Sequence, residues 1–265
     1  MFTPFQLASK YIRYYLTASN GKGHGVHSPF VYRFITEILQ DDRSFYLFEP
    51  IEQLRKKLLR DHSAIFIEDF GAGSRVYNTR QKQVSAIAGS SLKSKKIAQL
   101  LFRMVNDTAP STVLELGTSF GITTAYLAAA NSKASVITME GSPAVAEMAR
   151  KHFLDLGLQH IRQVTGNIDD TLDKTLESVD AVDFAFLDGN HRYEPTMRYF
   201  NKILEKSHEN TVIVLDDIHW SEEMEAAWEK VKKHPSVTLT IDLFFIGIVF
   251  FRKEQHVPEH FIIRF

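Results

Sequence analysis

The chain has 265 residues, of which 44% are apolar and 24% charged, and its formal net charge is −1. This composition is that of a globular protein and excludes intrinsic disorder, collagen-like repeats and small disulfide-rich folds. Cysteine is absent, which excludes disulfides, a thiolate nucleophile and a cysteine zinc site.

The first hundred residues show helical spacing of apolar residues in four places. These are residues 5–16, 29–40, about 51–60 and 91–105. The glycine-rich segment GKGHGVHSP (21–29) separates the first two predicted helices. We expect it to be a flexible linker. The alternative is that it gates the active site. Residues 70–91 are ambiguous. We therefore expect residues 1–110 to form a helical N-terminal cap beside the domain that follows.

From residue 111 onward, short β-rich runs alternate with amphipathic helical stretches. The predicted strands are residues 112–117, 135–140, 161–166, 182–189 and 211–217. Apolar strands that alternate with crossover helices predict a parallel sheet covered on both faces. Two further runs, 237–242 and 244–253, are separated by too few residues for a crossover, so they must pair antiparallel. The prediction for residues 111–265 is an α/β domain of five parallel strands closed by an antiparallel pair.

No segment of the sequence predicts a membrane span or a signal peptide. The longest apolar run, 243–251, has nine residues, less than half of the about 20 that a transmembrane helix needs. Charged and polar residues interrupt the apolar ones at the N-terminus. We expect a cytoplasmic protein without a membrane partner, and leave a homodimer open.

A glycine-containing turn follows the first predicted strand of the α/β domain. Glu115 begins the motif E-L-G-T-S-F-G, which ends at Gly121 where a helix is expected. A helix N-terminus there offers free N–H groups to an anion, but the spacing G-x-x-x-G differs from the G-x-G-x-x-G of dinucleotide sites. Glu140, 23 positions after Gly117, closes the second strand. Such an acid either accepts hydrogen bonds from both ribose hydroxyls or caps the helix that begins near Ser142.

These motifs, together with LDGNH at 187–191 and LDD at 215–217, resemble the class I S-adenosylmethionine-dependent methyltransferases. Within this class the sequence is most similar to the small-molecule O-methyltransferases related to catechol O-methyltransferase, over about residues 90–252. The resemblance implies a Rossmann-like sheet ending in an antiparallel pair and S-adenosylmethionine as cofactor. It implies the following cofactor-binding residues: Glu115, Gly117, Thr118, Ser119, Gly121, Glu140, Gly141, Ser142, Gly166, Asn167, Ile168 and Asp188.

The resemblance also implies which part of the cofactor each group of these residues contacts. Residues in the place of Glu115, Gly117 and Gly121 shape the methionine end of the pocket, and the acid in the place of Glu140 binds the ribose. The segment 166–168 is expected beside the adenine.

Three carboxylates end the fourth and fifth predicted strands. Asp188, Asp216 and Asp217 should meet in one crevice because the carboxyl ends of parallel strands share an edge. Oxygen ligands of this kind suit Mg²⁺ or another divalent cation. The metal-dependent relatives carry Asp, Asp and Asn, so Asp217 departs from their pattern. In the alternative, Asp216 or Asp217 caps the next segment and Asp188 only orders its loop.

His191 lies three residues after Asp188, where catechol-type enzymes carry a lysine base. Because histidine titrates near ~6.5, it can accept a hydroxyl proton at neutral pH. Contact with the cofactor, ligation of the metal and a structural role are its alternatives, and His219 is a second, weaker candidate. The predicted catalytic residues are therefore His191 and Asp188.

The sequence thus predicts in-line methyl transfer to a small phenol- or catechol-like acceptor. The segment DFGAGSR (69–75) is expected to belong to a substrate lid, with Arg75 and Arg80 as anion contacts. Residues 1–103 carry a net charge of +8 and residues 104–265 one of −9. This asymmetry indicates either two segments that attract each other or an anionic partner such as RNA. An RNA methyltransferase and a non-catalytic scaffold remain alternatives, and a nicotinamide oxidoreductase is the weakest.

Overall fold

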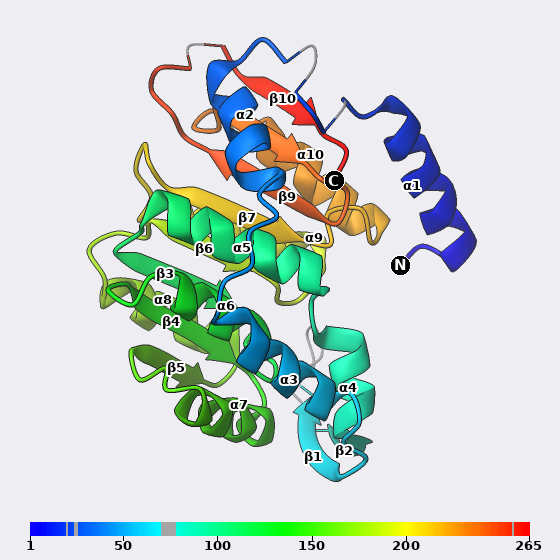
Figure 1. The fold of residues 1–265 in the computed structure, drawn as a ribbon, viewed down its shortest axis with the longest axis vertical. Coiled ribbons are helices and arrows are strands. Elements are labelled where there is room, and N and C mark those ends of the chain that lie inside the picture. Colours follow the sequence, from blue (N-terminus) through cyan, green and yellow to red (C-terminus); the bar gives the residue numbers. More distant parts are fainter. Residues whose placement is uncertain (20, 24–25, 70–77, 256) are drawn as a thin grey trace. The chain divides into compact units, whose positions relative to one another are not determined.

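The computed structural model describes residues 1–19, 21–23, 26–69, 78–255 and 257–265. They form two compact units, one made of residues 1–41 with 180–265 and the other of residues 42–179. Figure 1 labels most of the helices and strands of both. The domain boundary expected near residue 110 stays a prediction.

The unit of residues 42–179 is built around parallel strands. β4 (Ser135–Glu140) lies between β3 (Thr112–Leu116) and β5 (Ile161–Thr165), and both pairings are parallel. The strands alternate along the chain with α6 (Ile122–Ala130), α7 (Pro143–Asp155) and α8 (Ile168–Glu177). β3 and β4 are buried over most of their length, as their apolar sequences require.

The N-terminal part of this unit is helical with one added hairpin. Its elements are α3 (Phe48–Leu58), β1 (Ala64–Asp69), β2 (Asn78–Gln83), α4 (Val84–Ser91) and α5 (Lys95–Thr108). The ring of Phe48 lies 4.8 Å from that of Phe102 and 5.3 Å from that of Tyr126. Tyr126 also donates a hydrogen bond of 2.8 Å to Glu52, which pairs with Arg55 at 2.9 Å. Aromatic packing and the hydrogen bond of Tyr126 to Glu52 therefore fix α3 against α5 and α6.

The other unit contains both parallel and antiparallel strands. Its strands are β6 (Phe184–Leu187), β7 (Val212–Asp216), β8 (Leu239–Asp242), β9 (Ile246–Phe250) and β10 (Glu259–Ile262). β6 pairs parallel with β7, and β9 lies antiparallel between β7 and β8. β10 pairs parallel with β8 at the end of this order. The helices α9 (Tyr193–Leu204) and α10 (Glu222–Lys232) follow β6 and β7 along the chain.

The first helices of the chain belong to this same unit. They are α1 (Pro4–Thr17), α2 (Pro29–Phe34) and the π-helical turn η1 (Ile35–Leu39). The hydroxyl of Tyr14 donates to the carbonyl of Ile263 at 2.5 Å and accepts from the N–H of Phe265 at 3.1 Å. A bridge between Ser19 and Ile263 adds backbone pairing. The C-terminal segment therefore anchors α1, although the two are far apart in the sequence.

The α/β fold predicted from the sequence is confirmed, including the antiparallel β8–β9 pair that closes it. The sequence analysis did not predict β10 or α4, and the β1–β2 hairpin lies partly in the segment judged ambiguous. β10 is short and only partly buried, so its sequence lacks the apolar run that marks the central strands. Of the proposed lid, residues 70–77 with Arg75 lie outside the described residues, as do residues 24 and 25 of the glycine-rich segment.

Among the described residues, no helix is both long enough and apolar enough to cross a bilayer. The cytoplasmic location and the homodimer stay predictions.

Glycine is required at position 121, where β3 turns into α6. Gly121 has a φ of +81°, and a Cβ there would lie 2.4 Å from a ring carbon of Phe153 on α7. Gly157, after α7, has a similar φ of +71° but no atom within 4 Å of an added Cβ. Substitutions at the two positions therefore distinguish the cost of backbone strain from the cost of steric overlap.

We expect Gly121→Ala to lower the free energy of unfolding by about 2–4 kcal/mol, because left-handed strain and overpacking add together. Gly157→Ala should cost about 1–2 kcal/mol, since only the strain applies. Urea unfolding of both variants measures the difference. Equal losses would show that the contact of Gly121 with Phe153 is easily relaxed.

Candidate active site

The carboxylate of Glu115 is completely buried near the end of β3. Its Oε2 accepts hydrogen bonds from the hydroxyls of Thr124 and, at 2.7 Å, Thr138. Its Oε1 has no hydrogen-bond partner among the described residues. Burial raises the pKa of Glu115 to about 7, and the nearby charge of Glu140 adds to this rise.

Glu140 ties two turns together at the ends of β3 and β4. One carboxylate oxygen accepts from the N–H of Ser119 at 2.8 Å, and the other accepts from the N–H of Ser142 at 2.9 Å. Burial raises the pKa of Glu140 above its ordinary value, although these N–H donors oppose the rise. Ser142 is the residue before α7 (Pro143–Asp155), so this contact orders the turn that leads into the helix. Because two carboxylate oxygens offer about four acceptor positions, ribose hydroxyls can still be accepted.

Hydroxyl groups surround these carboxylates. Thr118 Oγ1 lies 2.6 Å from Thr138 Oγ1, and Ser119 Oγ lies 2.7 Å from Ser91 Oγ at the end of α4. The buried Oγ of Ser142 has no partner among the described residues. Sequence analysis missed Ser91, because no motif marks it and only tertiary contact brings α4 to this turn.

The third turn of this unit follows β5. The N–H of Gly166 donates to the carbonyl of Glu140 at 2.9 Å. Asn167 caps α8 by accepting from the N–H of Asp169 at 3.0 Å, and Ile168 is the first residue of that helix. The predicted cofactor residues between Glu115 and Ile168 thus lie on three neighbouring turns, at the carboxyl ends of β3, β4 and β5.

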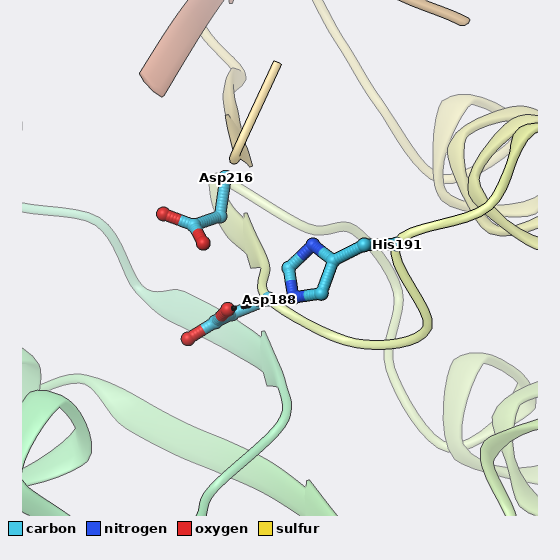
Figure 2. Close-up of side chains that lie close together, drawn as sticks. All are labelled: Asp188, His191 and Asp216. Atoms are coloured by element: carbon cyan, nitrogen blue, oxygen red, sulfur yellow. Dashed lines mark ion pairs between the residues drawn. The ribbon is translucent and has the colours of Figure 1, made fainter. Parts of the chain in front are cut away.

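A second group of acids lies in the other unit, at the ends of β6 and β7. One ligand atom from each of Asp188, His191 and Asp216 lies within 4.8 Å of the other two, and Figure 2 shows the three side chains gathered together. His191 Nε2 is 3.5 Å from Asp188 Oδ1. Asp216 is only 1% exposed. A buried carboxylate beside another carboxylate and an imidazole is a donor set that suits a divalent cation.

Asp217 lies at the edge of this cluster. Its Oδ2 is 4.0 Å from His191 Nε2. The residue has a φ of +53°, and its N–H donates to the carbonyl of Phe245 at 2.7 Å. The structure therefore brings together Asp188, His191 and Asp216 and places Asp217 beside the histidine.

His219 contacts different partners. Its Nδ1 lies 2.9 Å from Glu225 and its Nε2 lies 2.9 Å from Asp242. Burial lowers the pKa of His219, but the hydrogen bonds and charges of Asp242 and Glu225 outweigh it and raise the pKa above the ordinary value. Because both ring nitrogens are already engaged, His219 is poorly suited to accept a proton from an acceptor molecule.

A comparison with known protein families matches the part of the chain that contains both groups of acidic residues. Residues 114–218 match a family model described as a methyltransferase domain. The matched region begins at Leu114, beside Glu115, and ends at Ile218, after the acid cluster. No curated protein matches the chain.

Solved structures show the same fold at low sequence identity. An O-methyltransferase from Bacillus cereus in complex with S-adenosylhomocysteine is 20% identical, with a TM-score of 0.57, and the match covers 83% of this chain and 97% of that one. A methyltransferase from Podospora anserina with S-adenosylhomocysteine bound is 12% identical, with a TM-score of 0.60 and coverage of 96% and 98%. An O-methyltransferase from Streptomyces achromogenes, in complex with S-adenosylmethionine and involved in tomaymycin synthesis, is 17% identical, with a TM-score of 0.57 and coverage of 84% and 95%. The fold predicted from the resemblance is confirmed.

We expect Glu115→Gln to change how stability depends on pH. A folded-state pKa of about 7, above the ordinary 4.5, means that the wild type loses stability as pH rises through this window. The variant cannot lose this proton, so its stability relative to wild type should rise by roughly 1–3 kcal/mol between pH 5 and pH 8. Urea unfolding at both pH values tests this, with the exposed Glu177→Gln as control. A constant difference between variant and wild type would mean that Glu115 ionises normally.

Proposed function

We propose that the protein transfers a methyl group from S-adenosylmethionine to a hydroxyl group of a small phenol- or catechol-like molecule. The observation that carries this proposal is the methyltransferase domain of residues 114–218, which includes the Glu115–Gly121 turn, Glu140 and the Asp188–His191–Asp216 cluster. Two structures with the same fold are named as O-methyltransferases with this cofactor or its product bound.

The chemistry of the first unit fits the cofactor. S-adenosylmethionine carries an ammonium and a sulfonium cation, and the partnerless Oε1 of Glu115 and its raised pKa mark a buried carboxylate that a cation would compensate. Glu140 retains acceptor positions for ribose hydroxyls, and the unpartnered Ser142 Oγ is a further polar contact. We assign the methionine end to Glu115, Gly117 and Gly121, with the adenine beside segment 166–168.

The acid cluster fits a divalent cation that activates the acceptor. We assign Asp188, Asp216 and Asp217 to the ion, which would lower the pKa of a bound acceptor hydroxyl. His191 accepts the proton of that hydroxyl, and carboxylates 3.5 Å and 4.0 Å from its Nε2 stabilise the imidazolium that forms. S-adenosylmethionine held by the residues assigned above would supply the methyl group, and the deprotonated acceptor oxygen would be its nucleophile. The clustering of His191 with Asp188 and Asp216 also allows the imidazole to be an ion ligand.

Calorimetric titration tests the cofactor. We expect the wild type to bind S-adenosylhomocysteine, and Glu140→Gln to weaken this binding about 10- to 100-fold because charge-assisted hydrogen bonds to the ribose are lost. Glu147→Gln, which removes an exposed carboxylate from α7 in the same unit, is the matched control and should bind normally. Binding of NAD⁺ in place of S-adenosylhomocysteine would refute the proposed cofactor.

Removal of metal and of His191 tests the acceptor site. Chelation should abolish turnover of a catechol panel, and added Mg²⁺ should restore it. His191→Ala should keep Mn²⁺ binding but lower kcat by about 10²- to 10⁴-fold, the range of general base catalysis. His208→Ala removes a surface histidine that pairs with Asp183 and serves as control. If His191→Ala abolishes Mn²⁺ binding, the imidazole is a ligand; turnover unchanged by chelation would remove the ion from the mechanism.

A further inference from the structure

The loop between β7 and α10 carries Asp217 and is held by backbone contacts. The N–H of Asp217 donates to Phe245, and the carbonyl of Asp217 accepts from the N–H of Trp220 at 2.9 Å. Ser221 then caps α10 by accepting from the N–H of Met224 at 3.2 Å. Residues 217–221 are therefore a tight connection, and a shift of this loop would displace Asp217 relative to its neighbour Asp216.

The side chain of His219 connects this loop to two other elements. It bridges Glu225 on α10 and Asp242 at the end of β8, and its ring stacks on Phe244 at 5.2 Å. Asp242 also accepts from Trp228 Nε1 at 3.2 Å and from the N–H of Phe244 at 2.8 Å. Asp242 is only 6% exposed, and three donor groups surround its carboxylate. Its hydrogen bonds are therefore well satisfied, and the network resists rearrangement.

Helix α1 reaches the same loop from the other end of the sequence. Lys10 Nζ lies 3.0 Å from both carboxylate oxygens of Glu225, across 215 positions of the chain. The N–H of Phe2 donates to the carbonyl of Trp220 at 3.1 Å. The ring of Tyr11 lies 5.1 Å from that of Phe244. Figure 1 shows α1 beside α10, and these contacts make α1 a clamp on residues 217–225.

We propose that Lys10 and His219 are positioning residues that, through Glu225, hold the loop of residues 217–221 and thereby set the position of Asp217 beside His191. The consequence for metal binding rests on the proposed function, whereas the clamp itself does not. Lys10 and His219 both contact Glu225, and His219 also contacts Asp242, so each carboxylate of the network has a cationic neighbour when the imidazole is protonated. Lys10 and Glu225 are only 36% and 28% exposed in their side chains, so their pairing is less screened than that of surface ions.

Lys10→Met tests the clamp without removing a buried group. The anchoring of Tyr14 by Ile263 and Phe265 keeps α1 attached, so the variant should fold. Hydrogen–deuterium exchange should become faster at the amides of Asp217 and Trp220. Mn²⁺ affinity should fall about tenfold, the lower end of the range for groups that orient metal ligands. Affinity for S-adenosylhomocysteine should not change, whereas general destabilisation would affect both ligands.

Three further variants sharpen the test. Lys10→Arg keeps the cation and should restore wild-type exchange and Mn²⁺ affinity. Lys253→Met removes an exposed cation from its pair with Glu209 and should leave both unchanged. His219→Gln carries both of its N–H donors on one nitrogen and cannot replace Nδ1 and Nε2 at their two separate positions, so it should reproduce the effect of Lys10→Met.

The outcomes separate this inference from the proposed function. Unchanged exchange at Asp217 and Trp220 in both Lys10→Met and His219→Gln refutes the clamp. Faster exchange with unchanged Mn²⁺ affinity refutes its role in positioning Asp217 while leaving the proposed function intact. A wild type that binds no Mn²⁺ contradicts the proposed metal instead, and the exchange rates alone then decide whether the clamp exists.

Discussion

The candidate site depends on one constraint, which is that buried carboxylates must be compensated where parallel strands end. In the unit of residues 42–179, threonine hydroxyls compensate Glu115, and the N–H groups of two turns compensate Glu140. Glu140 thereby fixes the spacing of the turns that follow β3 and β4. Among the described residues, one oxygen of Glu115 has no partner, and burial raises the pKa of this carboxyl to about 7, so a cation beside it would favour its ionised form.

The other unit meets the same constraint differently. Asp188 and Asp216 lie together with the imidazole of His191, and two carboxylates so close repel each other unless a proton or a cation lies between them. This arrangement is suited to proton transfer and to cation binding at once. The two units therefore carry different chemistry: buried carboxylates with hydroxyl and N–H donors in residues 42–179, and a cluster of carboxylates with an imidazole in residues 180–265.

The uneven charge of the chain also has a local explanation. Residues 1–41 fold into one unit with residues 180–265, and Lys10 of the basic N-terminal part pairs with Glu225 of the acidic C-terminal part. Attraction between segments was one of the two interpretations of the charge asymmetry, and this ion pair is an example of it. Together with His219 and Asp242, the pair joins α1 to the loop that follows β7. An N-terminal helix that looks like an appendage in the sequence is therefore in contact with the connection that carries Asp217.

The sequence by itself determined the α/β fold, the parallel strands with their intervening helices, and the residues that end each strand. It could do so because these features follow from local apolar patterns and from turn residues such as Gly121, whose conformation is set within a few positions. Only the tertiary structure decided that Ser91 contacts Ser119, that His191 rather than Asp217 completes the cluster with Asp188 and Asp216, and that His219 is held between Glu225 and Asp242. These contacts join residues from different elements, in the case of Lys10 and Glu225 across 215 positions. No local pattern encodes them, because they arise from the way the folded elements pack.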